Sequence, residues 1–253
     1  MQILVCVKRV PTVGGAITLT ADRRAIDTKA SGFTISPHEE CAVEEAVRLV
    51  ERFGGSVTVA TLGPDAAQEQ LRACLALGAS AAVLLETAPG LEAGPIATAA
   101  ALHAVAADGG FDLVLLGNEA SDTGDYQVGI RLAHLLGWPV ATGIKALAID
   151  DAGGSASRTY QGVLETFALA LPCVVTVKEG INLPRYPSLP GRLRAKRAQL
   201  TRVPGPVAAA DGDVRMISLR VPDAPKKQAA VLGQGADAVP ALIDVLVQLG
   251  VIS

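Results

Sequence analysis

Short apolar runs alternate along the first half of the chain with longer stretches that have a helical apolar period. Continuous runs rich in β-branched residues are typical of strands buried on both faces of a parallel sheet. Glycine- or proline-marked turns separate them from the helical stretches. The pattern predicts strands at 3–7, 57–62, 82–85 and 111–117, and helices at 37–53, 65–77, 95–107 and from 126 to 136. This order predicts an α/β fold with a Rossmann-like, doubly wound, mostly parallel sheet, whose ligand crevice lies beyond the strands' carboxyl ends.

The clearest helix start is Ser36-Pro37-His38-Glu39. Serine is a favoured N-cap, proline fits the first helical position, and the glutamate at the third position completes a capping box. The apolar stripe of this helix is expected to be buried. Its polar face is expected to be in water and comprises Glu44, Glu45, Arg48, Glu51 and Arg52.

After about residue 143 the apolar period changes to two, which predicts strands that follow one another. A hairpin turn is expected at 150–155, a buried strand at 173–177, and an earlier hairpin excursion at 17–27. A proline-, alanine- and glycine-rich linker at 203–213 precedes a predicted strand at 214–221. An extended stretch at 226–237 and a helix at 239–249 follow. We therefore divide the chain into a domain at 1–205 and a C-terminal arm at 206–253 that wraps a partner subunit.

The segment 182–197 contains three prolines and a dense set of cationic side chains. Pro184, Pro187 and Pro190 fix φ and push the preceding residues toward extended geometry. Tyr186 and Leu189 would then be presented with little conformational entropy left to lose on binding. The composition alone fits a proline-rich connector as well as a docking loop.

Composition and charge narrow the classes of function. The 253 residues are 50% hydrophobic and carry a net charge of -3, which predicts a soluble globular protein with no general attraction to nucleic acid. No uncharged apolar stretch of about 18 residues is present, and the chain starts with a strand-like run, so we expect a cytoplasmic protein without membrane insertion. The four cysteines lie in apolar elements without metal-ligand spacing, and we expect no metal site.

The common phosphate-binding and nucleophile motifs are missing, which disfavours NTPases, nicotinamide dehydrogenases and serine hydrolases. The loop 117–125 remains. It follows the strongest predicted strand and precedes a helix, so its backbone N–H groups can converge on an anion, with donors added by Ser121 and Thr123. Plain helix capping by Asp122 or Asp125 is the alternative.

Taken together, the motifs resemble the electron transfer flavoprotein β subunit family over nearly the whole chain. They lie at 5–10, 40–49, 112–117, 137–139, 164–166, 171–172 and in the proline-rich loop. The resemblance implies a heterodimer in which a larger α subunit holds most of a redox-active FAD. The β subunit would complete the cleft and bind an AMP without redox function.

The resemblance also implies site residues. The family's nucleotide contacts fall on Cys6, Ser36, Pro37, His38, Glu39, Leu62, Gly117, Asn118, Glu119, Ala120, Ser121, Asp122, Thr123, Gly124, Asp125, Tyr126, Gln127 and Val128. The family's dehydrogenase-docking leucine corresponds to Leu189, and the other expected docking residues are Arg185, Tyr186, Arg192 and Arg194.

The chain departs from the family at a few positions. The family often has Asn where Ser36 stands and Tyr over the flavin where Val13 stands. Arg194 and Arg197 replace lysines of mitochondrial members, which excludes lysine methylation there. Glu165 and Asp122 are candidates for charge near the flavin.

The resemblance implies an electron carrier and not a substrate-transforming enzyme. It would accept electrons from flavin dehydrogenases such as acyl-CoA dehydrogenases and pass them through FAD to a downstream quinone-linked oxidoreductase. One alternative is an electron-bifurcating form with a second FAD in the AMP pocket and use of NADH. Residues 127–129 resemble that subgroup, although Ile130 stands where it often has Pro. Another alternative is a stress-type nucleotide-binding module without redox function.

Overall fold

The computed structural model describes residues 1–12, 14, 17–29, 31–88, 90–150, 153–222 and 229–252. The chain divides into two compact units, Met1–Leu219 and Arg220–Ser253. Three predicted features fall wholly or partly outside the described residues. They are the flavin-facing position Val13, residues 151–152 of the hairpin turn, and residues 226–228 of the extended stretch.

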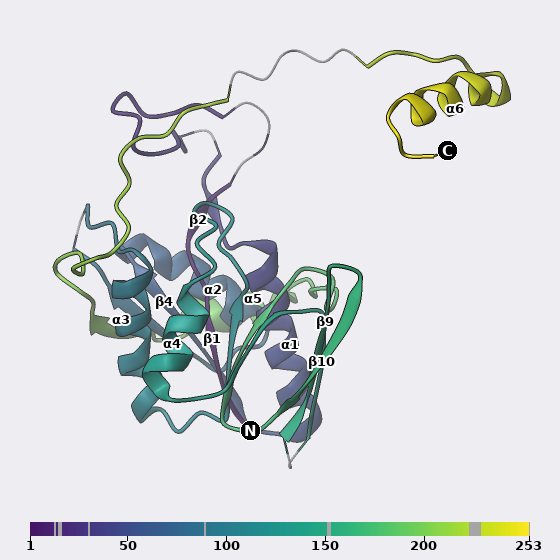
Figure 1. Ribbon diagram of the computed structural model, residues 1–253. Helices are drawn as coiled ribbons and strands as arrows, with labels where there is room; N and C mark the ends of the chain where they lie inside the picture. Colours follow the sequence, from purple (N-terminus) through teal and green to yellow (C-terminus); the bar gives the residue numbers. More distant parts are fainter. Residues whose placement is uncertain are drawn as a thin grey trace. The chain divides into compact units, whose positions relative to one another are not determined.

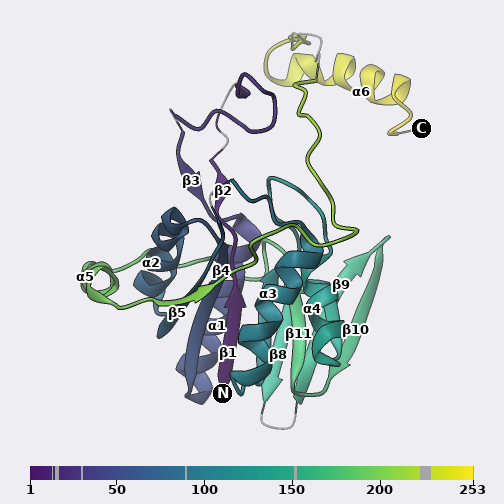
Figure 2. The same cartoon turned by 90° about the vertical axis from the view of Figure 1, so that its left-hand side faces the viewer.

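A seven-stranded sheet in the order β12-β5-β4-β1-β6-β11-β7 forms the centre of the first unit, and all its pairs are parallel. Its strands β1 and β4 lie side by side (Figures 1 and 2). This confirms the predicted doubly wound α/β fold. The strands are β1 (Gln2–Cys6), β4 (Ser56–Gly63), β5 (Ala81–Glu86), β6 (Leu113–Gly117), β7 (Val140–Ile144), β11 (Cys173–Val177) and β12 (Thr201–Pro204).

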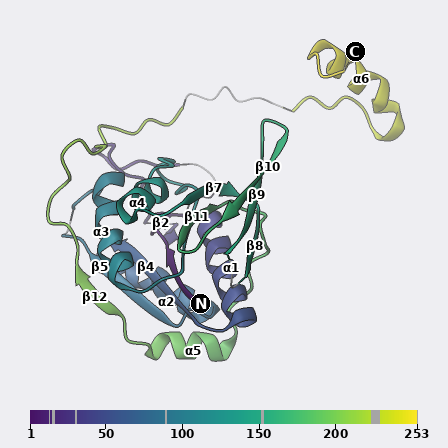
Figure 3. The ribbon, with the colours of Figure 1, turned by 60° about the horizontal axis from the view of Figure 1, so that its bottom comes forward.

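Helices cover both faces of the sheet (Figure 3). They are α1 (Pro37–Phe53), α2 (Gln68–Leu77) after the 3-10 turn η1 (Asp65–Ala67), α3 (Pro95–Asp108), α4 (Val128–Leu136) and α5 (Leu189–Arg197). Successive side chains of β1 enter different cores, because side chains alternate along a strand. Ile3 and Val5 pack with the helices α1 and α2, whereas Leu4 packs with α3 and α4.

Two smaller sheets complete the first unit. The strands β8 (Ala146–Asp150), β9 (Gly153–Tyr160) and β10 (Val163–Leu169) form an antiparallel meander, as the period of two predicts. Ile149, Ala156 and Leu169 bury one side of this meander in the core that contains α1. The strands β2 (Val10–Pro11) and β3 (Phe33–Thr34) flank the predicted excursion, which is confirmed as a hairpin by the bridge between Leu19 and Ile26.

The prediction of a strand at 214–221 is wrong. These residues are irregular, and Ile217 is exposed. The backbone N–H of Leu219 donates to the carbonyl of Arg23. Arg23 lies in an irregular segment, which does not provide the ladder of hydrogen bonds that a neighbouring strand would. A strand needs a neighbouring strand along its length, and the described residues provide none for 214–221. The local alternation of apolar residues contains no information on such a neighbour.

The strand β12 and the helix α5 are among the elements that the sequence does not predict. The strand β12 begins before the predicted linker at 203–213 and pairs with β5. The helix α5 occupies half of the proline-rich segment, with Ser188 as N-cap and its Oγ accepting from the Gly191 N–H at 3.1 Å. Our expectation that Pro190 keeps Leu189 extended is therefore wrong, because proline is also compatible with the first turn of a helix.

Residues after β12 remain attached to the first unit through Asp213. Its carboxylate accepts hydrogen bonds from the backbone N–H groups of Ile96 at 3.1 Å and Ala97 at 2.9 Å. It thereby caps the amino end of α3, where donors lack helical partners and a negative charge is favoured. The first compact unit extends to Leu219, whereas the sequence placed the start of the arm at 206. The functional division into domain and arm stays a prediction.

The second unit contains the 3-10 turn η2 (Gly235–Ala238) and the helix α6 (Val239–Gln248), which confirms the last predicted helix. Several large apolar side chains of this helix, among them Leu242, Ile243 and Val247, are exposed. No helix within the described ranges is both long and apolar enough to cross a membrane.

Replacing Asp213 should destabilise the first unit, because the Asp213→Ala variant leaves N–H groups of α3 uncapped. We expect a loss of about 1 kcal/mol, which corresponds to about 2–4 °C in the midpoint of thermal unfolding for a unit of this size. Circular dichroism can measure that midpoint. The matched control is Asp211→Ala at an exposed position nearby. Equal midpoints for the two variants would contradict the capping assignment.

Candidate functional site

The predicted site residues gather at the carboxyl edge of the parallel sheet. The strands β4, β1 and β6 are neighbours there, so the ends of all three lie side by side. Along the chain, β4 and β5 are added on one side of β1 within the sheet. The next strand, β6, is then placed on the other side of β1. Such a reversal of strand order opens a crevice beyond the strand ends, where doubly wound proteins bind ligands.

A buried carboxylate joins the end of β1 to the start of α1. Glu39 accepts hydrogen bonds from the backbone N–H of Lys8 at 3.1 Å and from that of Ser36 at 3.0 Å. The second bond belongs to the predicted capping box, which is confirmed. Burial raises the pKa of Glu39 to about 7, although both N–H donors and the Lys8 charge act to lower it. The Ser36 hydroxyl donates to the carbonyl of Glu119 at 3.4 Å and thereby connects the start of α1 to the loop after β6.

Gly117 allows the end of β6 to approach this helix start. A Cβ at this position would lie 2.8 Å from Cγ of Glu39 and 3.1 Å from Cβ of His38. Any larger residue would therefore separate β6 from α1. The Nδ1 atom of His38 is buried and has no hydrogen-bond partner among the described residues, and burial lowers the pKa of this histidine.

The loop after β6 pairs with a cation that was not predicted as a site residue. Nζ of Lys8 donates to Oδ1 of Asp122 at 2.7 Å and to Oγ1 of Thr123 at 3.4 Å. Gly124 closes a turn with a φ of 59°, and its N–H donates to the carbonyl of Ala120 at 2.9 Å. The position of Lys8, directly after the first strand, is the signal that could have identified it.

A second set of hydrogen bonds fixes the beginning of this loop. Thr176 Oγ1 accepts from the Gly143 N–H at 3.0 Å and donates to Asn118 Oδ1 at 2.8 Å. The Asn118 backbone N–H donates to the carbonyl of Val177 at 2.9 Å. Loop 118–127 is thus joined to β11 and, through Gly143, to β7. Thr176 could not be predicted from the sequence, because its contact with Asn118 depends on the order of strands in the sheet.

The remaining predicted nucleotide contacts lie on the same edge or in the same loop. Cys6 is buried at the end of β1, and burial followed by the nearby Glu39 charge raises its pKa. Leu62 lies near the end of β4, and Gln127 accepts two hydrogen bonds from Arg131 at 3.0 and 2.8 Å. A hydrogen bond to Glu119 raises the pKa of the exposed Tyr126. The edge therefore brings the hydroxyls of Ser36 and Thr123 and the ammonium group of Lys8 beside the backbone of the loop, a set that suits a phosphate.

The two carboxylates expected near a flavin lie on separate elements, each with its own cation. Glu165 on β10 accepts from Nε of Arg158 at 2.7 Å. The same guanidinium donates to the carbonyl of Thr142 at 2.8 Å. Asp122 pairs with Lys8 instead. Their predicted electrostatic effect on a flavin stays a prediction.

The proline-rich segment presents its apolar residues to solvent. Tyr186 is 95% exposed and Leu189 is 71% exposed. Arg192 and Arg194 are exposed on α5, whereas Arg185 forms ion pairs with α1. One of its partners, Glu44, was expected to face water, and this expectation is wrong because its side chain is only 3% exposed.

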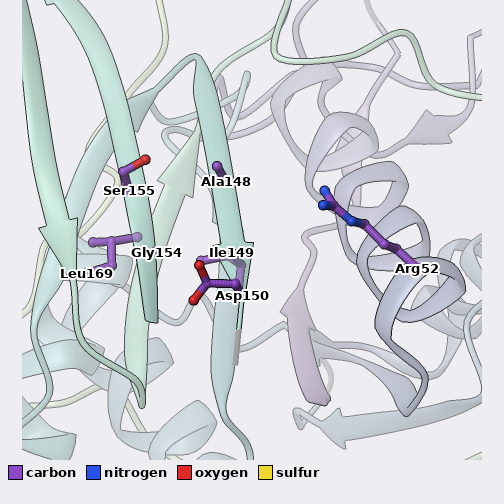
Figure 4. A pocket seen from close by; sticks show the side chains of 7 residues that line it. All are labelled: Arg52, Ala148, Ile149, Asp150, Gly154, Ser155 and Leu169. Carbon is purple, nitrogen blue, oxygen red and sulfur yellow. The ribbon is translucent and has the colours of Figure 1, made fainter. Parts of the chain in front are cut away.

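Two open hollows lie on other parts of the surface. One of about 460 Å³ is lined by Arg52 of α1 and by residues of the antiparallel meander (Figure 4). Its other lining residues are Ala148, Ile149, Asp150, Gly154, Ser155 and Leu169. The other, of about 450 Å³, is lined by Arg24, Arg215, Met216 and Ile217. None of the predicted cofactor residues lines either hollow.

Comparison with known proteins identifies the family. Residues 24–208 match the electron transfer flavoprotein domain. The chain is 35% identical to electron transfer flavoprotein subunit beta of Bacillus subtilis over 242 residues, which cover 94% of this chain and 93% of that protein. It is 35% identical to the mitochondrial subunit beta of Oryza sativa subsp. japonica over 240 residues (94% and 95%) and 34% identical to the human subunit beta over 235 residues (91% and 92%). This chain therefore belongs to the family of electron transfer flavoprotein β subunits, as its sequence motifs predicted.

Proposed function

We propose that this chain is the β subunit of a heterodimeric electron transfer flavoprotein that carries electrons through an FAD held mostly by its α subunit. When bound, the FAD supplies the redox chemistry, and this chain completes its surroundings and holds an AMP. Family membership and the arrangement of the sheet edge support this proposal. The stress-type module without redox function is disfavoured because the matched relatives are named electron transfer flavoprotein subunits.

One observation carries the nucleotide part of the proposal. Residues from the ends of β1, β4 and β6 and from the start of α1 lie at one switch-point edge. Lys8 Nζ lies beside loop 118–127, where it donates to Asp122 and Thr123. We assign the AMP phosphate to this loop and the adenosine to the ends of the neighbouring strands.

The partners follow from the same proposal. Segment 182–197 would dock flavin dehydrogenases such as acyl-CoA dehydrogenases, and the C-terminal arm would bind the α subunit through the exposed apolar side chains of α6. Electrons would continue to a quinone-linked oxidoreductase. The complex would act in the cytoplasm.

The electron-bifurcating form is the alternative within the family, and its signal is the run 127–129. Packing offers a different reason for Gly129, because a Cβ there would lie 2.5 Å from Cγ2 of Thr176. The glycine is thus required by the contact of α4 with β11, whichever nucleotide is bound. We therefore favour AMP over a second FAD.

The purified complex with its α subunit should contain about one FAD and about one AMP per heterodimer, since the β-chain edge would hold a nucleotide without flavin. Absorbance of the released flavin and chromatography of the released nucleotides measure both. Two flavins without AMP would support bifurcation. A complex without flavin would refute the carrier function.

The variant Thr123→Pro should lose AMP, because proline removes one backbone donor of the loop and restrains Asp122 before it. Nucleotide released from the purified heterodimer is the measurement. Thr123→Ala is the matched control, which removes only the hydroxyl and should retain more AMP. AMP at the wild-type amount in Thr123→Pro would refute the assignment of the phosphate to this loop.

The variant Leu189→Ala should weaken dehydrogenase-coupled reduction about 30-fold, because an apolar anchor of an interface contributes roughly 2 kcal/mol or more. Since Leu189 is 71% exposed, folding should not change. Flavin content, AMP content and reduction by dithionite serve as controls and should stay normal. Unchanged coupled rates would show that the segment is only a connector, and loss of flavin would show a structural function.

A further inference from the structure

The proline-rich segment is bound to the outer face of α1 through one buried carboxylate. Glu44 accepts from Nε of Arg185 at 2.9 Å and from the backbone N–H of the same residue at 3.1 Å. Nε of Arg48 donates to the other carboxylate oxygen at 2.6 Å. Because the Glu44 side chain is only 3% exposed, the carboxylate end of these bonds is shielded from water, and the bonds fix both the side chain and the backbone of Arg185.

Arg185 is bound at its other end by a second carboxylate of the same helix. Its Nη1 and Nη2 donate to the two oxygens of Glu51 at 2.6 and 2.9 Å. Two parallel bonds of this kind define the orientation of a guanidinium group. Burial alone would raise the pKa of Glu44, but hydrogen bonds from Arg185 and Arg48 keep it below its usual value. We call Glu44, Glu51 and Arg185 the α1 clamp.

Residues just before the clamp are also attached to α1. Nδ2 of Asn182 donates to the carbonyl of Cys41 at 3.0 Å and to Oε2 of Glu45 at 2.9 Å. Nη2 of Arg48 donates to the carbonyl of Leu183 at 3.4 Å. The stretch from Asn182 to Arg185 therefore follows the helix surface and is bonded to it at both ends.

The other flank of the segment is fixed to α2, beside which α5 lies (Figure 3). A Cβ on Gly191 would lie 2.4 Å from the carbonyl oxygen of Ala76, so the two helices are in close contact. Nη1 of Arg72 donates to the carbonyls of Ala195 at 2.6 Å and Ala198 at 3.1 Å. These bonds satisfy carbonyls at the end of α5, which lack helical partners.

Tyr186 and Leu189 therefore project from a short stretch between two anchored flanks, with Pro187 restricting it further. Binding a partner then orders few additional dihedral angles, and such preorganisation strengthens an interface without adding a contact. An arginine whose donors are already bound to Glu44 and Glu51 has little to offer a partner.

We propose that Glu44 and Arg185 are positioning residues for dehydrogenase docking, and that Arg185 acts by orienting Leu189 and not by contacting the dehydrogenase. The proposal rests on the proposed docking function of segment 182–197. It assigns Arg185 a different role from its neighbours Arg192 and Arg194, whose side chains are exposed on α5.

The test uses the heterodimer of this chain with its α subunit, together with an acyl-CoA dehydrogenase that reduces the wild-type complex. Glu44→Gln should raise the KM for the complex about tenfold, while kcat and flavin content stay unchanged. A nitroxide on Tyr186→Cys, prepared separately, should become more mobile when Glu44→Gln is added. Within this chain the label would be selective, because all four of its native cysteines are buried. The control Glu69→Gln removes a carboxylate of α2 that forms an ion pair with Arg9, and it should change neither readout.

Arg185→Lys is the second variant, and it guards against misfolding of Glu44→Gln. It keeps the charge and loses the two-pronged bond to Glu51, so both readouts should change in the same direction by a smaller amount. The positioning role would be overturned if label mobility stayed unchanged in both variants, or if KM stayed unchanged in both. If Leu189→Ala still raised KM in that case, the docking function would stand. If Leu189→Ala also had no effect, the docking function itself would fail.

Discussion

The site depends on the close contact between the end of β6 and the start of α1. Glu39 occupies this contact and accepts backbone N–H bonds from the end of β1 and from the N-cap of the helix. Gly117 leaves the space that the Glu39 side chain fills. Moving the helix away would leave a buried carboxyl group without donors, which costs about 1–3 kcal/mol or more. One buried acid and one absent Cβ thus hold the ends of β1 and β6 and the start of α1 in a common geometry.

Elements of the first half of the chain could be predicted from the sequence because each has a complete local signal. The helix at 37–53 has an N-cap, a capping box and a terminating glycine pair, and its predicted bounds are those of α1. Elements that depend on distant partners could not be predicted in this way. β12 forms because β5 offers a free edge, and Glu44 is buried because Arg185 reaches it from a segment far along the chain.

The same distinction holds for the candidate site. Every nucleotide contact inferred by resemblance lies at or near a strand end, in the loop after one, or at the start of a helix, so the doubly wound order was sufficient to bring them to one edge. The interactions among them follow from the order of strands in space. Lys8 meets Asp122 because β1 and β6 are neighbours, and Thr176 meets Asn118 because β11 lies next to β6. A pattern along one dimension contains no information on these neighbours.

The strand β12 has a consequence for aggregation. A parallel sheet of seven strands ends in two open edges, and an exposed edge can pair with another chain. β12 is only four residues long and forms the edge beside β5. It ends in Pro204, which has no N–H to offer, and it carries Arg202, whose guanidinium pairs with Asp65 and Glu86. A short edge with a proline and a charged side chain is a poor template for a foreign strand, so the segment that leads out of α5 also protects this side of the sheet against edge-to-edge association.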